Sequence, residues 1–396
     1  MSIKNWELSD KWLKAAVIGG LWASIEIVIG SFLHNLRIPF AGTILAAQGI
    51  IILLAFMTLW PERGIIIRAG IITALMKSIS PSAVILGPMI GIMTEAILLE
   101  LFLLLLGRNL FGFIIAASIS LSSALLHKVA TFIILYGLDI IKIYENIFNW
   151  FKKKLHIGNI SAYEFILLLL GIYLFWGFIA GITGYIIGRK AKMLGSQPEF
   201  SAHAEITEEF FPINKNQSFH IYYLFLHLVS IPIGLLLLNF AHVYIGLIYI
   251  ILFLVFAITK YKRSMRRLKK PIFWVQLIII VLLAALFGNT EASTVKYFST
   301  AGLLYGLEMS LRAIFVVIAF TAISVELRNP MIQQKMNSHF AKSIYESLSI
   351  AFGVLPRVIK ALPKSTEFFT HPFRTFSVLI AQTKNDFEKG IYKNQK

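Results

Sequence analysis

Long apolar stretches constrain this chain more than any other feature. A helix of roughly 20 mainly apolar residues crosses the hydrocarbon core of a bilayer, and about ten such stretches follow one another here. A backbone surrounded by lipid must satisfy its own hydrogen bonds, so we predict an all-α polytopic membrane protein. The stretches cover residues 15–33, 40–60, 64–79, 82–106, 110–137, 162–188, 221–240, 242–259, 271–287 and 302–324.

Composition argues against a soluble domain, and the motifs of several enzyme classes are missing from the sequence. Charged residues make up only 14% of the chain and apolar residues 57%, whereas soluble domains carry about 25% charged residues. There is no cysteine, no phosphate-binding Gly-x-x-x-x-Gly-Lys-Ser/Thr loop, no His-Glu-x-x-His zinc motif and no Gly-x-Ser-x-Gly elbow. We therefore expect no catalytic residues, no metal and no bound cofactor. Membrane topology accounts for the net charge of +17 without nucleic-acid binding.

A polar segment divides the apolar stretches into two groups. Residues 189–217 contain four glutamates and several other polar residues, and we interpret them as a linker. The sequence thus predicts two bundles of six and four spans. The first is a domain at residues 1–188 and the second a domain at residues 218–396, whose last part, about residues 330–396, forms a cytoplasmic amphipathic helical tail.

Basic loops predict the orientation. Residues 260–270 contain seven bases and no acid, so this loop should be cytoplasmic. Counting spans from it places the N- and C-termini of the protein in the cytoplasm, in an inner or plasma membrane. One loop disagrees, because Lys152, Lys153 and Lys154 fall on the outer side by this count, in a segment expected to form an amphipathic surface helix.

Polar side chains inside the apolar stretches are the candidate binding residues. Such groups are costly in lipid and often mark a functional site. We predict that a small-molecule pocket with charged and aromatic walls includes Trp22, Glu26, Glu95, His127 and Lys128. In the alternative interpretation Glu95 pairs with Lys128 between helices and Trp22 packs against lipid.

Small residues recur at every fourth position of the first apolar stretch. Such stripes allow helix backbones to approach closely in a membrane. We predict either a docking face for a partner helix or ordinary packing within the six-span bundle. One stripe consists of Ala15, Gly19 and Ala23, and its neighbour of Ala16, Gly20 and Ser24.

Two charged residues occupy the last apolar stretch. Glu308 precedes Arg312 by four residues, which is the favourable order for an ion pair within one helix. Pairing reduces the cost of placing both charges in lipid, so we interpret the pair as a structural clasp.

The segment from residue 340 to 362 alternates apolar and charged positions at helical spacing. Its apolar face includes Phe352, and the bases Arg357 and Lys360 follow. This pattern suits a helix that lies on a membrane or against a soluble partner.

The second half resembles the transmembrane (T) component of energy-coupling factor (ECF) transporters, the family that includes the cobalt-transport membrane subunit. The resemblance rests on Arg-Arg-Leu-Lys-Lys-Pro at 266–271, Gly-Leu-Glu-Met-Ser-Leu-Arg at 306–312, Thr-Ala-Ile-Ser at 321–324 and Leu-Ser-Ile-Ala-Phe-Gly-Val-Leu-Pro at 348–356. In that family the last pattern opens the cytoplasmic coupling helices, which implies a coupling role for Phe352, Arg357 and Lys360. The first half resembles a substrate-binding (S) component in its size, its glycine and alanine usage and its small-residue first helix.

The resemblance implies a membrane subunit of an ECF-type importer. It would capture a vitamin, a related precursor or a metal ion and work with separate ABC-type ATPase subunits. The Ala-Arg-Gly triplet that T components usually carry is absent from the chain. One alternative is an ion-coupled secondary transporter in which Glu26, Glu95 or His127 titrates. A membrane-embedded enzyme acting on a lipid is the other, and the dispersed charges argue against it.

Overall fold

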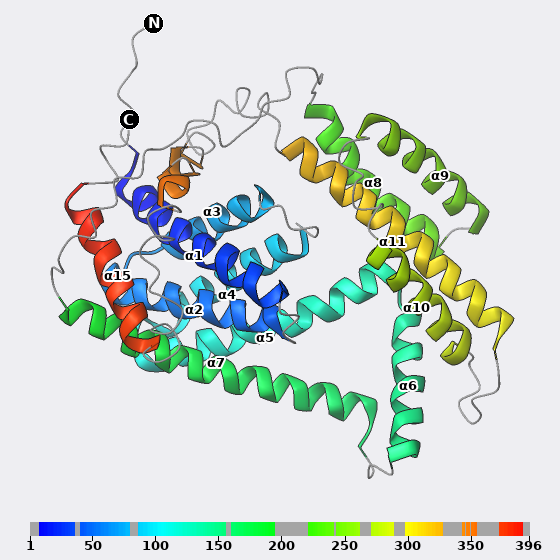
Figure 1. Cartoon of the computed structure of the whole chain (residues 1–396), viewed down its shortest axis with the longest axis horizontal. Helices are drawn as coiled ribbons and strands as arrows, with labels where there is room; N and C mark the ends of the chain where they lie inside the picture. The colour runs from blue at the N-terminus through cyan, green and yellow to red at the C-terminus, as the bar shows by residue number, and fades with distance from the viewer. Residues whose placement is uncertain are drawn as a thin grey trace, which may run out of the picture. The chain divides into compact units, whose positions relative to one another are not determined.

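In the part of the chain that the computed structural model describes, the regular secondary structure consists of helices and no strand occurs (Figure 1). Contacts between helices divide the chain into two units. Unit 1 combines Met1–Leu126, Leu170–Pro212 and Met336–Lys396, and unit 2 combines His127–Leu169 and Ile213–Lys335. The described residues are 8–35, 40–79, 86–155, 160–194, 221–240, 243–261, 271–288, 298–327, 343–344, 346–348, 350–354 and 372–390.

Among the described residues, six helices are long and apolar enough to cross a membrane, which confirms the expected multi-pass, all-helical class. They are Asp10–Gly30, Ala41–Leu59, Pro88–Leu106, Leu110–Tyr136, Ala162–Met193 and Thr300–Ile323. Three further apolar helices are shorter, at Tyr222–Leu238, Tyr244–Lys260 and Phe273–Phe287. The expected span at 64–79 is a helix of 15 residues. The count of ten spans in bundles of six and four stays a prediction.

Unit 1 is built around its first helix. It contains α1 (Asp10–Asn35), α2 (Ala41–Leu59), α3 (Ile65–Ile79), α4 (Leu86–Leu106), α15 (Pro372–Glu388) and parts of α5 (Leu110–Tyr136) and α7 (Ala162–Met193). Helix α1 packs against α2, α3 and α15, and it is buried along most of its length because nearly every residue there is apolar or small.

Small residues let α1 approach two neighbours at once. A Cβ atom at Gly19 would lie 2.8 Å from the carbonyl oxygen of Ala69 on α3, and the Thr73 hydroxyl donates to the carbonyl oxygen of Gly19 at 3.0 Å. On another side, a Cβ atom at Gly20 would lie 2.9 Å from the Cα atom of Ala351. The two stripes therefore face different helices within unit 1.

Helix α7 uses glycines in the same way. A Cβ atom at Gly181 would lie 2.7 Å from the Cα atom of Ile114 on α5, and one at Gly184 would lie 2.8 Å from the Cβ atom of Leu54 on α2. Such contacts allow backbones to pack without intervening side chains. Gly171, on the same helix, has nothing within 4 Å of its Cβ position.

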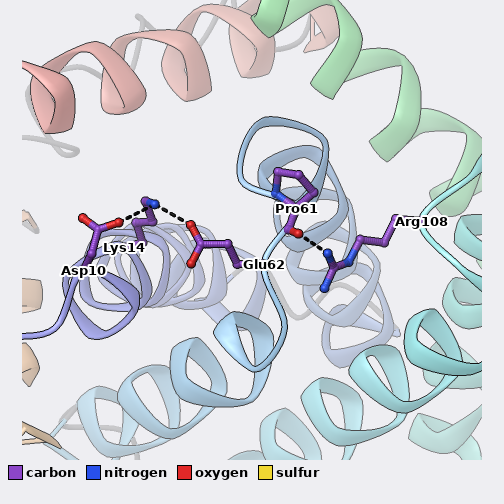
Figure 2. Close-up of polar contacts among 5 residues, drawn as sticks. All are labelled: Asp10, Lys14, Pro61, Glu62 and Arg108. Atoms are coloured by element: carbon purple, nitrogen blue, oxygen red, sulfur yellow. Dashed lines mark hydrogen bonds and ion pairs between the residues drawn. The ribbon is translucent and has the colours of Figure 1, made fainter.

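Polar contacts gather at one end of unit 1 (Figure 2). The Lys14 ammonium lies 2.5 Å from carboxylate oxygens of both Asp10 and Glu62. The Arg108 guanidinium donates to the carbonyl oxygen of Pro61. The start of α1, the turn between α2 and α3, and the turn between α4 and α5 therefore lie together. Helix α15 joins them through an aromatic contact between Phe387 and Trp60.

Unit 2 contains α6 (Asp139–Leu155), α8 (Ile221–Phe240), α9 (Val243–Lys260), α10 (Pro271–Phe287) and α11 (Thr300–Leu327). Helix α11 packs against α8, α9 and α10. Helix α6 forms where we expected a surface helix, and the Asn146 amide fixes it to α10 by donating to the carbonyl oxygen of Phe287 at 2.6 Å. Lys153 and Lys154 are exposed in its last turn.

We predict that Gly181→Ala lowers the free energy of unfolding by about 1–3 kcal/mol, because the added methyl group meets backbone atoms of α5. The matched variant Gly171→Ala should be neutral or slightly stabilising, since alanine favours a helix over glycine by up to about 1 kcal/mol. Titration of the purified protein with SDS, followed by tryptophan fluorescence, measures both. Equal losses in the two variants would contradict the close packing of α7 on α5.

Candidate functional site

Five buried polar side chains from four helices lie in the interior of unit 1. We call this set the α1–α4 cluster. Each of these polar side chains lies on an apolar helix, and each is less than a tenth exposed. The cluster consists of Trp22 (0%), Glu26 (7%), Gln48 (9%), Lys77 (7%) and Glu95 (6%).

An ion pair joins two of these helices. The Lys77 ammonium lies 3.4 Å from a carboxylate oxygen of Glu26. Both side chains are about nine-tenths buried, so neither charge is well hydrated and each depends on the other. Gly30 lies beside the lysine, since a Cβ atom there would be at the ordinary contact distance of 3.7 Å from its Nζ atom. Removing one partner would leave a buried, uncompensated charge.

The indole of Trp22 lies directly on the backbone of α2. A Cβ atom at Gly49 would overlap its Nε1 atom, so only glycine permits this contact. Within the described part of the chain, neither the indole N–H nor either amide atom of Gln48 has a hydrogen-bond partner. Buried polar groups are nearly always satisfied in folded proteins.

Glu95 adds a second carboxyl group to the cluster. Its charged neighbour is Glu26, which acts on it electrostatically. Its main-chain carbonyl accepts a hydrogen bond of 2.9 Å from the Ser120 hydroxyl, which fixes α4 against α5. The cluster therefore holds two carboxyl groups and one ammonium group. A role of these groups in binding a small molecule stays a prediction.

The binding residues that we predicted from the sequence fall into two groups by their location in the structure. The structure brings Trp22, Glu26 and Glu95 together in unit 1, whereas His127 and Lys128 lie in unit 2 and are partly buried. A role for these last two in binding stays a prediction. Our sequence reasoning missed Lys77 and Gln48. Gln48 sits in the middle of an apolar stretch, so the criterion that selected Glu95 also identifies it.

The predicted coupling segment is partly described. Residues 343–344, 346–348 and 350–354 are helical, and Phe352 is buried in unit 1. The Ser347 hydroxyl donates to the carbonyl oxygen of Trp12 at 3.4 Å, so this helix lies along α1. Arg357 and Lys360 lie outside the described residues.

The expected ion pair of Glu308 and Arg312 on α11 lies near a further acid, Asp139. Arg312 is buried, and its guanidinium lies against Gly137, in the turn between α5 and α6. Asp139 and Glu308 are the acidic groups that act on its charge. Arg312 thus connects α11 to the start of α6, in addition to its expected relation to Glu308.

A second buried polar group lies within unit 2. The Tyr261 hydroxyl donates to a carboxylate oxygen of Glu326 at 2.5 Å and lies 2.8 Å from Nε2 of His227. The Lys260 ammonium lies 4.0 Å from the same carboxylate and over the ring of Tyr223. Burial, followed by the hydrogen bond and charge of Glu326, raises the pKa of Tyr261, so its hydroxyl keeps the proton that it donates. These contacts join α8, the end of α9 and the end of α11.

No group of three or more His, Asp or Glu side chains in the described ranges is arranged to hold a metal ion. Comparisons of the chain with protein families, curated protein sequences and solved structures find no match. Function therefore has to be argued from the residues themselves.

We predict that Tyr261→Phe lowers the free energy of unfolding by about 1.5–3 kcal/mol, because it removes a hydrogen bond to a buried charged group. Tyr249→Phe is the matched control in the same unit, since that hydroxyl donates to the neutral carbonyl oxygen of Ser230 at 3.1 Å. Its loss should cost about 0.5–1.5 kcal/mol. SDS titration compares the two, and an equal or smaller effect of Tyr261→Phe would refute the charged network.

Proposed function

We propose that this protein is the membrane subunit of an ECF-type importer that captures a small molecule and connects it to separate ABC-type ATPases. The observation that carries the proposal is that α1 belongs to the α1–α4 cluster and also contacts the helical residues around Ala351. It contributes Trp22 and Glu26 to the α1–α4 cluster, and through Gly20 it contacts the helix that contains Ala351. That helix has the sequence pattern that resembles the coupling segment of a T component.

The geometry of α1 supports coupling between the two sites. Gly20 and Glu26 are six residues apart, which is about 9 Å along a helix. A shift of α1 that repositions Glu26 against Lys77 must also move Gly20 against Ala351, because backbone atoms meet there with no flexible side chain between them. Ligand binding at the cluster and motion of the coupling segment would thus be linked through a single rigid helix.

Charge distribution supports a cytoplasmic location for the end of unit 1 shown in Figure 2. Lys14 and Arg108 lie there, and the contact of Gly188 with Thr58 brings the basic end of α7 to the same side. An excess of bases is typical of the cytoplasmic face. The protein would then reside in an inner or plasma membrane with both termini in the cytoplasm, and Glu26, further along α1, would lie nearer the outer face.

The energy source would be supplied by partner subunits. The chain lacks a phosphate-binding loop of its own, and we propose that the coupling region with Arg357 and Lys360 engages the ATPases. The buried helical residues 351–354, which include Phe352, would connect those subunits to α1.

Orientation is testable because the protein has no native cysteine. Gly42 is exposed at the start of α2, and Arg63 is exposed in the turn between α2 and α3. We expect Gly42→Cys to react with a membrane-impermeant maleimide in intact cells, and Arg63→Cys to react only after permeabilisation. The reverse pattern would invert the topology and place the coupling segment outside the cell.

Coupling through α1 predicts a separation of binding from transport. Gly20→Leu should displace the helical residues 350–354 and reduce ATP-driven uptake at least ten-fold in proteoliposomes that contain the ATPases, while ligand binding to the purified subunit persists. Gly171→Leu, on an open face of α7, should behave like the unmodified protein.

A different result would favour the ion-coupled alternative. If the protein alone accumulates substrate in proteoliposomes under an ion gradient, without ATPases, the ECF assignment fails. Glu26, Glu95 and Lys77 would then be the first groups to test for ion coupling, since buried ionisable residues are common in such carriers.

A further inference from the structure

We propose that the surface formed by α6 and the first turn of α7 binds anionic phospholipid. Exposed apolar side chains of α6 would enter the membrane interface, and Lys152, Lys153 and Lys154 would lie against the lipid phosphate. The inference goes beyond the proposed function, because this surface belongs to unit 2, whereas the α1–α4 cluster and the coupling segment belong to unit 1.

Two adjacent apolar rows run along α6. Six of its 17 residues are charged, and this helix is not among the candidate spans. Residues three and four positions apart share a face of a helix, and the apolar residues of α6 follow that spacing twice. The inner row consists of Ile143, Ile147 and Trp150, and the outer row of Ile141, Tyr144, Phe148, Phe151 and Leu155.

The inner row fixes α6 within unit 2. Ile143 packs in one cluster with Ala284 of α10 and Met309 of α11. The ring centroid of Trp150 lies 6.0 Å from that of Phe287, the last residue of α10. The last turn of α6, which carries the three lysines, therefore follows the end of an apolar helix.

The outer row meets the start of α7. The Tyr144 hydroxyl donates to the carbonyl oxygen of Ala162 at 3.2 Å. The ring centroid of Phe148 lies 5.6 Å from that of Phe165. Because the candidate span Ala162–Met193 begins here, these contacts place the outer row at the level where α7 would enter the membrane.

The last turn of α6 combines exposed apolar and basic side chains. Phe151 is 50% exposed and Leu155 63% exposed, and the three lysines lie between them in the sequence. Lys153 and Lys154 are exposed, and neither forms an ion pair within the described part of the chain. An external anion can therefore reach them next to an apolar surface.

The acids of this region leave the lysines with an excess of positive charge. Helix α6 contains four lysines and two acids, a formal charge of plus two. One of these acids, Asp139, lies 3.6 Å from the Lys142 ammonium at the far end of the helix. On α7, the Glu164 carboxylate accepts the main-chain N–H of Ser161 at 2.7 Å and so caps that helix.

Phospholipid matches this surface better than a soluble acidic partner does. Lysines on one face of a helix and aromatic or leucine side chains on the other are typical of helices in a membrane interface. The apolar stem of a lysine can lie along such side chains while its ammonium reaches the phosphate. A soluble acidic partner would match the lysines but would offer no apolar counterpart to Phe151 and Leu155. Lipid binding also explains three lysines on the side where the span count predicts few bases.

A fluorescent probe beside the lysines tests the proposal, because the chain has no native cysteine. Leu155→Cys is labelled with nitrobenzoxadiazole and reconstituted in phosphatidylcholine vesicles. The vesicles contain a fixed mole fraction of doxyl-labelled quencher lipid, either phosphatidylglycerol or phosphatidylcholine. We expect phosphatidylglycerol to quench about two-fold or more strongly, since lysines near the membrane surface attract anionic headgroups. High salt should reduce this preference, because it screens exposed charges.

The matched control probe is Ile248→Cys, at an exposed apolar position on α9 of the same unit. This position lies twelve residues before Lys260, the nearest base along the chain. Both quencher lipids should act equally there. An equal preference for phosphatidylglycerol at both positions overturns the proposal, because the net charge of +17 would then attract anionic lipid without a site.

Charge variants locate the effect. The combined variant Lys152→Gln, Lys153→Gln, Lys154→Gln should lower the quenching ratio of the two lipids at position 155 to about one. The corresponding Lys→Arg substitutions should preserve the ratio, because they keep the charge. A ratio retained by the glutamine variant overturns the proposal. If that variant does not fold, the comparison of the two probe positions still decides.

Two further results overturn the proposal. Equal quenching by both lipids at position 155 means that α6 does not distinguish anionic from neutral lipid. No quenching by either lipid means that another protein or a second copy of the chain covers this surface. None of these outcomes bears on the importer assignment, which the coupling test decides.

Discussion

The close approach of α1 to its neighbours is the constraint on which the rest of unit 1 depends. Backbone atoms of α1 and α3 meet at Gly19, and those of α1 and the helical residues 350–354 meet at Gly20. In a bilayer, helices gain little from hydrophobic burial against one another, so contact surface and hydrogen bonds decide their association. A larger side chain at Gly19 would move α1 away from α3 and separate Glu26 from Lys77.

Buried charge in this protein is accommodated by pairing and by main-chain groups. Glu26 meets Lys77 inside unit 1, and Glu326 accepts the hydrogen bond of Tyr261 inside unit 2. The carboxylate of Glu100 accepts hydrogen bonds from the main-chain N–H groups of Gly64 and Ile66 and so caps the start of α3. A carboxylate at a helix N-terminus is favoured by the helix dipole. The capping explains one acid within an apolar stretch without a role in binding.

The sequence predicted the helices well, because the length and apolar content of a membrane span are local properties. The cost of polar groups in lipid selected Glu26 and Glu95 as candidate binding residues, and Trp22 lies one helical turn before Glu26; their role in binding stays a prediction. The pairing of Glu26 with Lys77 depends on tertiary packing and was not foreseen. The contact of Ser347 with Trp12 joins residues 335 positions apart, which no local pattern encodes. His227 and Glu326 were also missed, although each is a polar residue near or within an apolar stretch.

The contact between α1 and the helical residues 350–354 is intramolecular. When two helices belong to one chain, each experiences the other at an effective concentration on the order of millimolar. A contact as small as the one at Gly20 can then remain formed without the affinity that two separate subunits would need. The same continuity fixes the ratio of the two elements at one to one, so their relative synthesis needs no regulation.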